Sequence, residues 1–343
     1  MPASQRVPDK FFYKGASQLI PLSSTSVTVI IVNWNADTYL EQCLLRLTKQ
    51  TLQSSRILVM DNGSTDGSAE RVQHMSGVTV KYLDANLGFA VANNRALLEC
   101  DSEFVVLLNP DAFPEPDWLQ NLVSAANTYP EYTAFGSRQL NAATPEILDG
   151  TGDVYHISGK VWRNGIGKQQ KDSDLIAREI FSPCAAAALY RRQAFIDVGG
   201  FDEDFFCYME DVDLGFRLRL AGHKAMYVPD AVVHHVGSAT TGGSRSDFSV
   251  YHGHRNLVWC FVKNMPGLLF WLLLPAHVLL NVVTVIWFVI RGHGKVIFRA
   301  KRDALLGLPK MWEKRKQIQA NRVASIADIW RVLNKRVVLF KGS

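Results

Sequence analysis

The chain has 343 residues, of which 48% are hydrophobic and 20% are charged, and its formal net charge is +5. This length is enough for one large α/β domain with an appendage, or for two domains. The five cysteines form an odd set without a C-x-x-C pair. This spacing argues against a disulfide framework or a zinc site and favours a reducing cytosol.

The positive charge is concentrated at the C-terminal end. After Ile290 the chain carries 14 Lys or Arg and three acidic residues, whereas residues 1–290 have a net charge of −6. A basic tail predicts an anionic partner, and the neighbouring apolar segment favours a membrane surface over nucleic acid. Residues 1–26 lack an apolar core, so we expect an N-terminal extension and no signal peptide there.

Apolar runs typical of strands alternate with helical patterns through the first third of the chain. The predicted strands cover residues 27–32, 57–60, 78–83 and 104–108, and the clearest helices cover residues 39–47 and 89–98. This alternation predicts an α/β fold, with a Rossmann-like, mostly parallel sheet and helices on both faces.

Polar residues follow three of these strands, at 33–35, 61–64 and 109–111. Ligands of parallel α/β sheets bind beyond the carboxyl ends of the strands. The three clusters therefore predict a binding site at that edge.

The next part of the chain is less regular. Glycines are frequent in residues 140–180, where we expect loops and short antiparallel strands. A buried strand is predicted over residues 181–190, a helix over 210–220 ending at Gly222, and a last strand over 226–236.

Residues 266–290 contain no Asp, Glu, Lys or Arg, and this is long enough to span a bilayer. Pro275, His277 and Asn281 interrupt the segment, and a single crossing would separate the basic tail from the rest of the chain. We favour helices lying in the membrane surface or re-entering it, with a break near Pro275. A true span and a buried core helix are the alternatives.

Acidic residues gather between Asp202 and Asp213, among Phe201, Phe205 and Tyr208. A solvated acidic surface would not carry so many aromatic residues. We therefore predict carboxylates in a partly dry site, where shifted pKa values suit a general base.

The pattern G-G-F-D-E-x-F-x-x-x-x-E-D-x-D-L of residues 199–214 resembles the acceptor-side segment of family 2 inverting glycosyltransferases, which have the GT-A fold. The Asn-Pro-Asp of residues 109–111 and the His-Arg-Asn of residues 254–256 are similar to those of bacterial rhamnosyltransferases in this family. The resemblance covers roughly residues 26–265. It implies a glycosyltransferase domain over 27–264 and a membrane-associated helical segment with a basic tail over 265–343.

The resemblance also implies the chemical roles of four residues. Asp211, beside Glu210, would be the general base that activates an acceptor hydroxyl. Asp111 and His235 would hold Mg²⁺ or Mn²⁺, both of which accept oxygen ligands, against a nucleotide diphosphate. The family motif has Asp where this chain has Asn109, which is expected to be a neutral contact. His234 is the alternative to His235, but it would face the opposite side of a strand.

The remaining candidates belong to the donor site. Asp61 would accept a hydrogen bond from a nucleobase, because it ends the second strand at the family's base-binding position. Arg255, with His254, would bind the diphosphate of the donor or of a lipid-linked acceptor. The other predicted donor-binding residues are Asn33, Asn35, Asn86, Gly88 and Asn93.

The implied reaction is transfer of rhamnose from dTDP-rhamnose to a polyprenyl-diphosphate-linked saccharide. It would take place at the cytoplasmic face of the bacterial inner membrane. A transferase that uses a UDP-hexose is one alternative, and a catalytically silent scaffold of a polysaccharide assembly complex is another.

Overall fold

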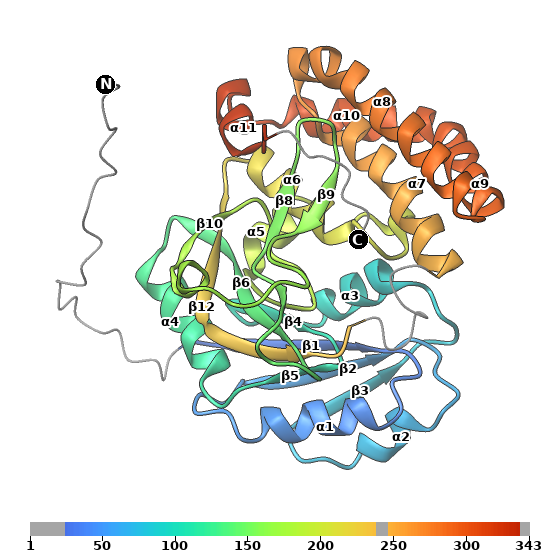
Figure 1. Cartoon of the computed structure of the whole chain (residues 1–343). Helices are drawn as coiled ribbons and strands as arrows, with labels where there is room; N and C mark the ends of the chain where they lie inside the picture. The colour runs from blue at the N-terminus through green and yellow to red at the C-terminus, as the bar shows by residue number, and fades with distance from the viewer. Residues whose placement is uncertain (1–24, 238–245, 337–343) are drawn as a thin grey trace.

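The computed structural model describes residues 25–237 and 246–336 (Figure 1). The predicted N-terminal extension therefore lies outside the described residues, except for its last two. The end of the basic tail, residues 337–343, also lies outside them.

A ten-stranded mixed sheet forms the centre of the molecule, in the order β10-β12-β6-β11-β4-β1-β2-β3, with β5 and β7 paired at its side. The β4-β1-β2-β3 part is parallel, and β12 runs parallel to β6, whereas β11 is antiparallel to both of its neighbours. The predicted mostly parallel sheet is confirmed. Its strands are β1 (Val27–Asn33), β2 (Arg56–Asp61), β3 (Val78–Tyr82), β4 (Phe104–Leu108), β5 (Ala112–Pro114), β6 (Tyr132–Asn141), β7 (Leu148–Gly150), β10 (Arg178–Ile180), β11 (Ala187–Arg191) and β12 (Lys224–His235).

Helices cover both faces of this sheet (Figure 1). In β1, Val29 and Ile31 point to one core cluster, and Ile30 points to the other, because side chains alternate along a strand. The first cluster is covered by α1 (Thr38–Leu47), α2 (Ser68–Val72) and α4 (Trp118–Thr128). The second is covered by α3 (Phe89–Leu98), α5 (Arg192–Asp197) and α6 (Glu210–Leu220).

The strand predicted over residues 181–190 is only half right, since β11 begins at Ala187. Pro183 cannot donate a ladder hydrogen bond, and a turn in which Ala187 N donates to Cys184 O precedes the strand. A separate hairpin of β8 (Asp153–Tyr155) and β9 (Val161–Arg163) lies within the region expected to be loops and short strands.

Five helices follow β12 and pack beside α6 (Figure 1). They share a third core cluster with the acidic segment, in which Phe205 and Phe216 meet Phe261 and Phe270. This cluster crosses the boundary predicted between residues 264 and 265. The helices are α7 (Asp247–Asn264), α8 (Gly267–Ile290), α9 (Gly294–Leu306), α10 (Leu308–Ala320) and α11 (Ile326–Val332).

Within the described ranges, α8 is the one helix long and apolar enough to cross a membrane. It continues through Pro275, so the predicted break is wrong. A proline removes one helical hydrogen bond, and this loss is outweighed by packing of the inner face of α8 on α7 and α9. Only 17% of the most apolar 18-residue stretch of α8 is buried, which excludes the alternative of a buried core helix.

Candidate active site

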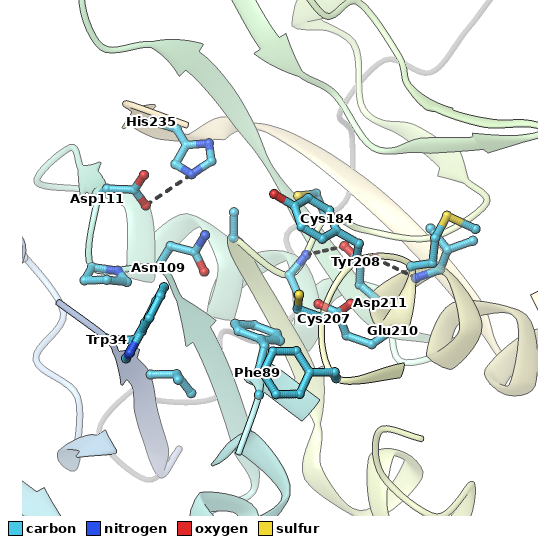
Figure 2. A pocket seen from close by; sticks show the side chains of 18 of the residues that line it. Trp34, Phe89, Asn109, Asp111, Cys184, Cys207, Tyr208, Glu210, Asp211 and His235 are labelled. Atoms are coloured by element: carbon cyan, nitrogen blue, oxygen red, sulfur yellow. Dashed lines mark hydrogen bonds and ion pairs between the residues drawn. The ribbon is translucent and has the colours of Figure 1, made fainter. Parts of the chain in front are cut away.

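A pocket of about 350 Å³ opens beyond the carboxyl ends of β1 and β4, where the polar clusters predicted it. Figure 2 shows Asp111 and His235 on one side of the pocket, and Asp211 with Glu210 on the other. The pocket brings together seven of the predicted site residues. They are Asn86, Gly88, Asn109, Asp111, Glu210, Asp211 and His235.

Asp111 and His235 are held together by strand pairing, because β5 and β12 place His235 opposite Ala112. His235 Nε2 lies 3.3 Å from Asp111 Oδ1, and both side chains are almost fully buried. His234 points the other way and contacts Glu115 Oε1 at 3.0 Å. Of the two histidines, His235 therefore lines the pocket.

Asp149 is a carboxylate that the sequence analysis missed. Its Oδ2 lies 2.7 Å from His235 Nδ1, and it also accepts a hydrogen bond from Arg163. Burial opposes ionisation, but His235 and Arg163 lower the pKa of Asp149 below its usual range. Asp149 belongs to β7, a three-residue strand without a clear sequence pattern, so no local signal could have identified it.

The Asp111–His235 pair fits a divalent cation. Burial disfavours a charged imidazole, yet the neighbouring carboxylates raise the pKa of His235 to about 9, so a cation that binds here would displace a proton from the ring. Asp149 holds the second ring nitrogen, as carboxylates do behind metal-binding histidines. Among the described residues, no group of three His, Cys, Asp or Glu side chains could hold a metal. An ion here would need further ligands from a substrate or water.

Glu210 and Asp211 begin α6 on the opposite wall. Asp211 Oδ2 accepts a hydrogen bond from Ala185 N at 3.2 Å, and its Oδ1 accepts one from Val212 N at 2.8 Å. Glu210 is buried, and no group among the described residues hydrogen-bonds its Oε2. The two neighbouring carboxylates therefore have different environments.

This difference separates their protonation. Burial, and then the charge of Asp211, raise the pKa of Glu210 well above its usual value. Burial also raises the pKa of Asp211, but backbone N–H groups and Arg163 oppose the shift. A third pocket carboxylate, Asp153 of β8, has a pKa raised to about 8 by burial and then by Asp211. Of the three carboxylates, Asp211 is thus the one whose ionised form receives hydrogen bonds from the backbone of two other residues.

The segment before α6 has an unusual backbone. Phe206, Tyr208 and Met209 all have positive φ angles, between 63° and 71°. Such conformations are costly for residues with side chains, so the surrounding structure must hold them in place.

Asn256 of α7 supplies this support. Its buried amide nitrogen donates to Phe205 O, Cys207 O and Tyr208 O at 2.7–2.9 Å. Arg255 adds hydrogen bonds to Asp204 O and Phe205 O. Arg255, predicted to bind a diphosphate, lies outside the pocket wall, with its donors directed at this backbone.

Gly88, predicted to bind the donor, allows the start of α3 to pack closely against Phe206. A Cβ atom at this position would lie 2.6 Å from the Phe206 ring, and Ala90 N donates to Phe206 O at 3.1 Å. The start of α3 is therefore packed against the segment that precedes Glu210. This contact is the structural reason for glycine at position 88.

Four predicted donor-binding residues lie behind the pocket wall: Asn33, Asn35, Asp61 and Asn93. Asn33 is fully buried, and its amide donates to Asp61 Oδ1, Ser64 Oγ and Ser68 Oγ. Asp61 Oδ2 also accepts from Ser64 N at 3.0 Å. The residue after Asp61, Asn62, reaches the wall and donates to Asn86 Oδ1 at 2.9 Å.

Part of the acidic segment contacts the basic helices. Lys263 and Lys314 donate to the Asp202 carboxylate, and Lys310 and Lys314 donate to that of Asp204. Lys263 also lies 2.7 Å from Asp213 Oδ1. Only Glu210 and Asp211 among the clustered acids line the pocket, while Asp202, Asp204 and Asp213 attach the segment to α7 and α10.

The pocket also contains aromatic residues that sequence reasoning did not select. Trp34 follows β1, and Trp162 lies on the hairpin. Trp34 adjoins the predicted Asn33–Asn35 cluster, so its position was an available signal. Trp162 had none, because a single tryptophan in an irregular segment indicates no particular site.

Comparisons with known proteins identify the family of the chain. The family described as Glycosyl transferase family 2 matches residues 28–199. The chain is 32% identical over 255 residues to the N-acetylglucosaminyl-diphospho-decaprenol L-rhamnosyltransferase of Mycobacterium tuberculosis (strain ATCC 25618 / H37Rv), covering 65% of this chain and 80% of that protein. It is 25% identical over 228 residues to the O-antigen chain rhamnosyltransferase RfbN of Salmonella typhimurium, covering 66% and 70%.

Two solved structures have the same fold. The mannosyltransferase PcManGT from Pyrobaculum calidifontis, in complex with GDP-Man and Mn²⁺, aligns with a TM-score of 0.53 and 18% identity, covering 89% of this chain and 87% of that one. GalNAc-T7 with UDP, GalNAc and Mn²⁺ aligns with a TM-score of 0.57 and 15% identity, covering 70% and 48%. At these identities the likeness concerns the fold alone.

Proposed function

Since the chain belongs to glycosyl transferase family 2, we propose that it transfers rhamnose from dTDP-rhamnose to a polyprenyl-diphosphate-linked saccharide. Two relatives named as rhamnosyltransferases, one of them acting on an N-acetylglucosaminyl-diphospho-decaprenol, support this choice of sugar and acceptor. The observation that carries the proposal is one pocket with Asp111 and His235 on one wall and Glu210 and Asp211 on the other.

Asp211 is the proposed general base. Its carboxylate takes the proton of the acceptor hydroxyl while that oxygen forms a bond to the anomeric carbon. The bond from this carbon to the nucleotide diphosphate breaks on the opposite face, and one such displacement inverts the configuration. Protonated Glu210 leaves the negative charge on Asp211.

Asp111 and His235 are the proposed ligands of Mg²⁺ or Mn²⁺, with Asn109 as a neutral neighbour. The cation would stabilise the negative charge that develops on the leaving diphosphate. Asp149 orients His235, since it fixes the other ring nitrogen.

The nucleobase is proposed to lie at the ends of β1 and β2. Asp61 is buried behind the pocket wall, where its carboxylate accepts hydrogen bonds from the Asn33 amide and from Ser64 N, so its proposed role is to hold this edge of the base site in place. Asn62, Asn86 and Trp34 provide polar and aromatic surface on the same side of the pocket.

The protein is proposed to rest on the cytoplasmic face of the inner membrane. One face of α8 is exposed and apolar, whereas the opposite face packs on helices that are attached to the acidic segment. Both ends of α8 therefore remain on the side of the pocket. This arrangement supports a helix lying in the membrane surface rather than a crossing.

The test is transfer to N-acetylglucosaminyl-diphospho-polyprenol with Mg²⁺ or Mn²⁺, using dTDP-rhamnose, UDP-glucose, UDP-galactose and UDP-GlcNAc as separate donors. Turnover with dTDP-rhamnose alone, lost on addition of EDTA, is the expected result. Turnover with a UDP-sugar alone would reject the proposed donor but retain the chemistry. No turnover with any donor would favour the silent scaffold.

A further inference from the structure

A second hollow, of about 370 Å³, lies where the first turns of α7 and α9 meet. Phe248 of α7 lines both this hollow and the active-site pocket, so the two spaces share an aromatic wall. His252 also lines the hollow and stacks on Phe206 of the active-site wall, with 5.2 Å between the two ring centroids. The remaining wall is built from Asp247, Tyr251, Lys295, Val296 and Arg299.

The hollow has positive charge available for a ligand. Lys295 is exposed, and none of the ion pairs among the described residues involves it. Arg299 is 68% exposed and lies 4.0 Å from Asp303, which is bound more closely by Arg302 at 2.8 Å. Asp247 is the carboxylate on the wall, and it contacts His293 at 3.4 Å.

The backbone adds to this charge. Lys295 belongs to the first turn of α9, a 13-residue helix whose N-cap, His293, makes no side-chain capping bond. The first amides of such a helix point outward and favour an anion. The two cations on the wall of the hollow thus belong to the N-terminal part of an uncapped helix, where the helix dipole adds to their positive charge.

Exposed apolar side chains lie on either side of the junction between α8 and α9, next to the first turn of α9 that lines the hollow. Ile286 and Ile290, at the end of α8, and Phe298 of α9 are between 53% and 78% exposed. An occupant of the hollow would therefore have the catalytic pocket on one side and a lipid-like surface on the other. A lipid-linked sugar diphosphate has a sugar, a diphosphate and a lipid chain in this order, which matches the order of pocket, hollow and apolar surface.

We propose that Lys295 and Arg299 bind the diphosphate of the lipid-linked acceptor, with its sugar extending past Phe248 towards Asp211 and its chain following the end of α8. This inference rests on the proposed function, and it replaces the role first expected of Arg255 and His254. Arg255 Nη2 donates to the backbone carbonyls of Asp204 and Phe205, its Nε donates to Asn256 Oδ1, and His254 packs edge-on against Phe288 at 4.9 Å.

The test compares the double variant Lys295→Gln/Arg299→Gln of the full chain with a control, Lys316→Gln/Arg331→Gln. The control removes two exposed charges of the same basic tail outside the hollow. Assays in detergent micelles measure KM for the lipid-linked acceptor and for dTDP-rhamnose. An alkyl N-acetylglucosaminide, which lacks the diphosphate, serves as a second acceptor.

We expect the double variant to raise KM for the diphosphate acceptor about 10-fold to 100-fold, as loss of two charge-assisted contacts predicts. KM for dTDP-rhamnose and turnover of the alkyl glycoside should stay at the wild-type values. An equal effect in the control, or an equal loss with the alkyl glycoside, would overturn the inference. If wild type transfers rhamnose to neither acceptor, the proposed function fails before the variant is considered.

Binding of farnesyl diphosphate in detergent gives a readout that needs no turnover. The double variant should bind it at least about 10-fold more weakly than wild type and the control. If farnesyl diphosphate binding is unchanged while binding to phosphatidylglycerol vesicles falls, the hollow holds phospholipid headgroups and the acceptor assignment is wrong.

Discussion

At the scale of single residues, the decisive contrast is between the two neighbouring carboxylates at the start of α6. Replacing Asp211 by Asn removes the base but keeps the shape of the side chain. We expect kcat to fall by about 10²-fold to 10⁴-fold, with the donor Kd unchanged within about 3-fold. Calorimetric titration of the nucleotide and single-turnover assays check the two quantities. A parallel loss of donor affinity would argue that Asp211 binds the donor instead.

Asp149 offers a residue-scale test of the metal pair that leaves both proposed ligands in place. The change Asp149→Asn weakens the hold on His235 Nδ1. The Mn²⁺ concentration for half-maximal activity should rise about 10-fold to 100-fold, while kcat at saturating Mn²⁺ changes much less. Glu115→Gln, beside the outward-facing His234, is the matched control and should leave the Mn²⁺ titration unchanged.

Asp153 predicts a pH dependence of stability. Its pKa is raised from 3.8 to about 8 in the folded protein, so the folded state holds a proton that the unfolded chain releases. The stabilisation is present at low pH and is lost as the pH rises towards 8. The melting temperature of metal-free protein should fall between about pH 6 and about pH 8.5, and Asp153→Asn should reduce that fall. Asp101→Asn, an exposed control, should behave like wild type.

At the scale of elements, α7 determines the conformation of the segment that leads into α6. Asn256→Ala would leave three carbonyls without their shared donor. We expect the free energy of unfolding to fall by about 1–3 kcal/mol and kcat to fall at least about 10-fold, because Asp211 loses its position. The donor KM should change little.

Asn264→Ala is the control for that experiment, since Asn264 is an equally buried residue of α7 that donates to Asp213 Oδ1. It should reduce stability similarly with a smaller effect on kcat. If both variants lower kcat equally, general destabilisation explains the loss and the positioning role of Asn256 is rejected.

The elements also show what a sequence can and cannot predict. The helices at 89–98 and 210–220 and the strand at 104–108 have the predicted bounds, because their apolar periodicity and flanking turns are local signals. The pocket edge was predictable for the same reason. By contrast, Asp149 is brought to His235, and Asp153 to the pocket, by short strands whose pairing depends on distant residues.

The acidic segment shows a related limit. A cluster of carboxylates near aromatic residues indicated one dry site, but in the structure some of the acids line the pocket and others attach the segment to the C-terminal helices. Asp202 and Asp204 contact Lys314, more than 100 residues away in the chain. Such pairing depends on how α10 returns to the domain, which charge alone does not specify.

At the scale of the whole molecule, the exposed face of α8 predicts membrane binding without a crossing. The variant Trp271→Ser/Leu272→Ser/Leu279→Ser changes residues that are 61–68% exposed, so the core beneath should persist. We expect it to lose flotation with phosphatidylglycerol vesicles and to keep transfer to an acceptor dispersed in detergent. The matched variant Leu45→Ser/Leu98→Ser/Leu175→Ser alters exposed leucines elsewhere and should still float. Flotation of both variants would place the membrane contact outside α8.

The hydrogen bonds from Asn256 to the segment before α6 have a consequence for product length. They join the proposed base, Asp211, to the helix bundle that carries the proposed membrane-facing surface, so the base would stand at a fixed height above the lipid. Each sugar added to a carrier moves the growing end farther from the bilayer. Because the base could not move away from the bilayer with that end, it would act only on a saccharide of a given length. The protein would then select its acceptor by length as well as by sugar composition.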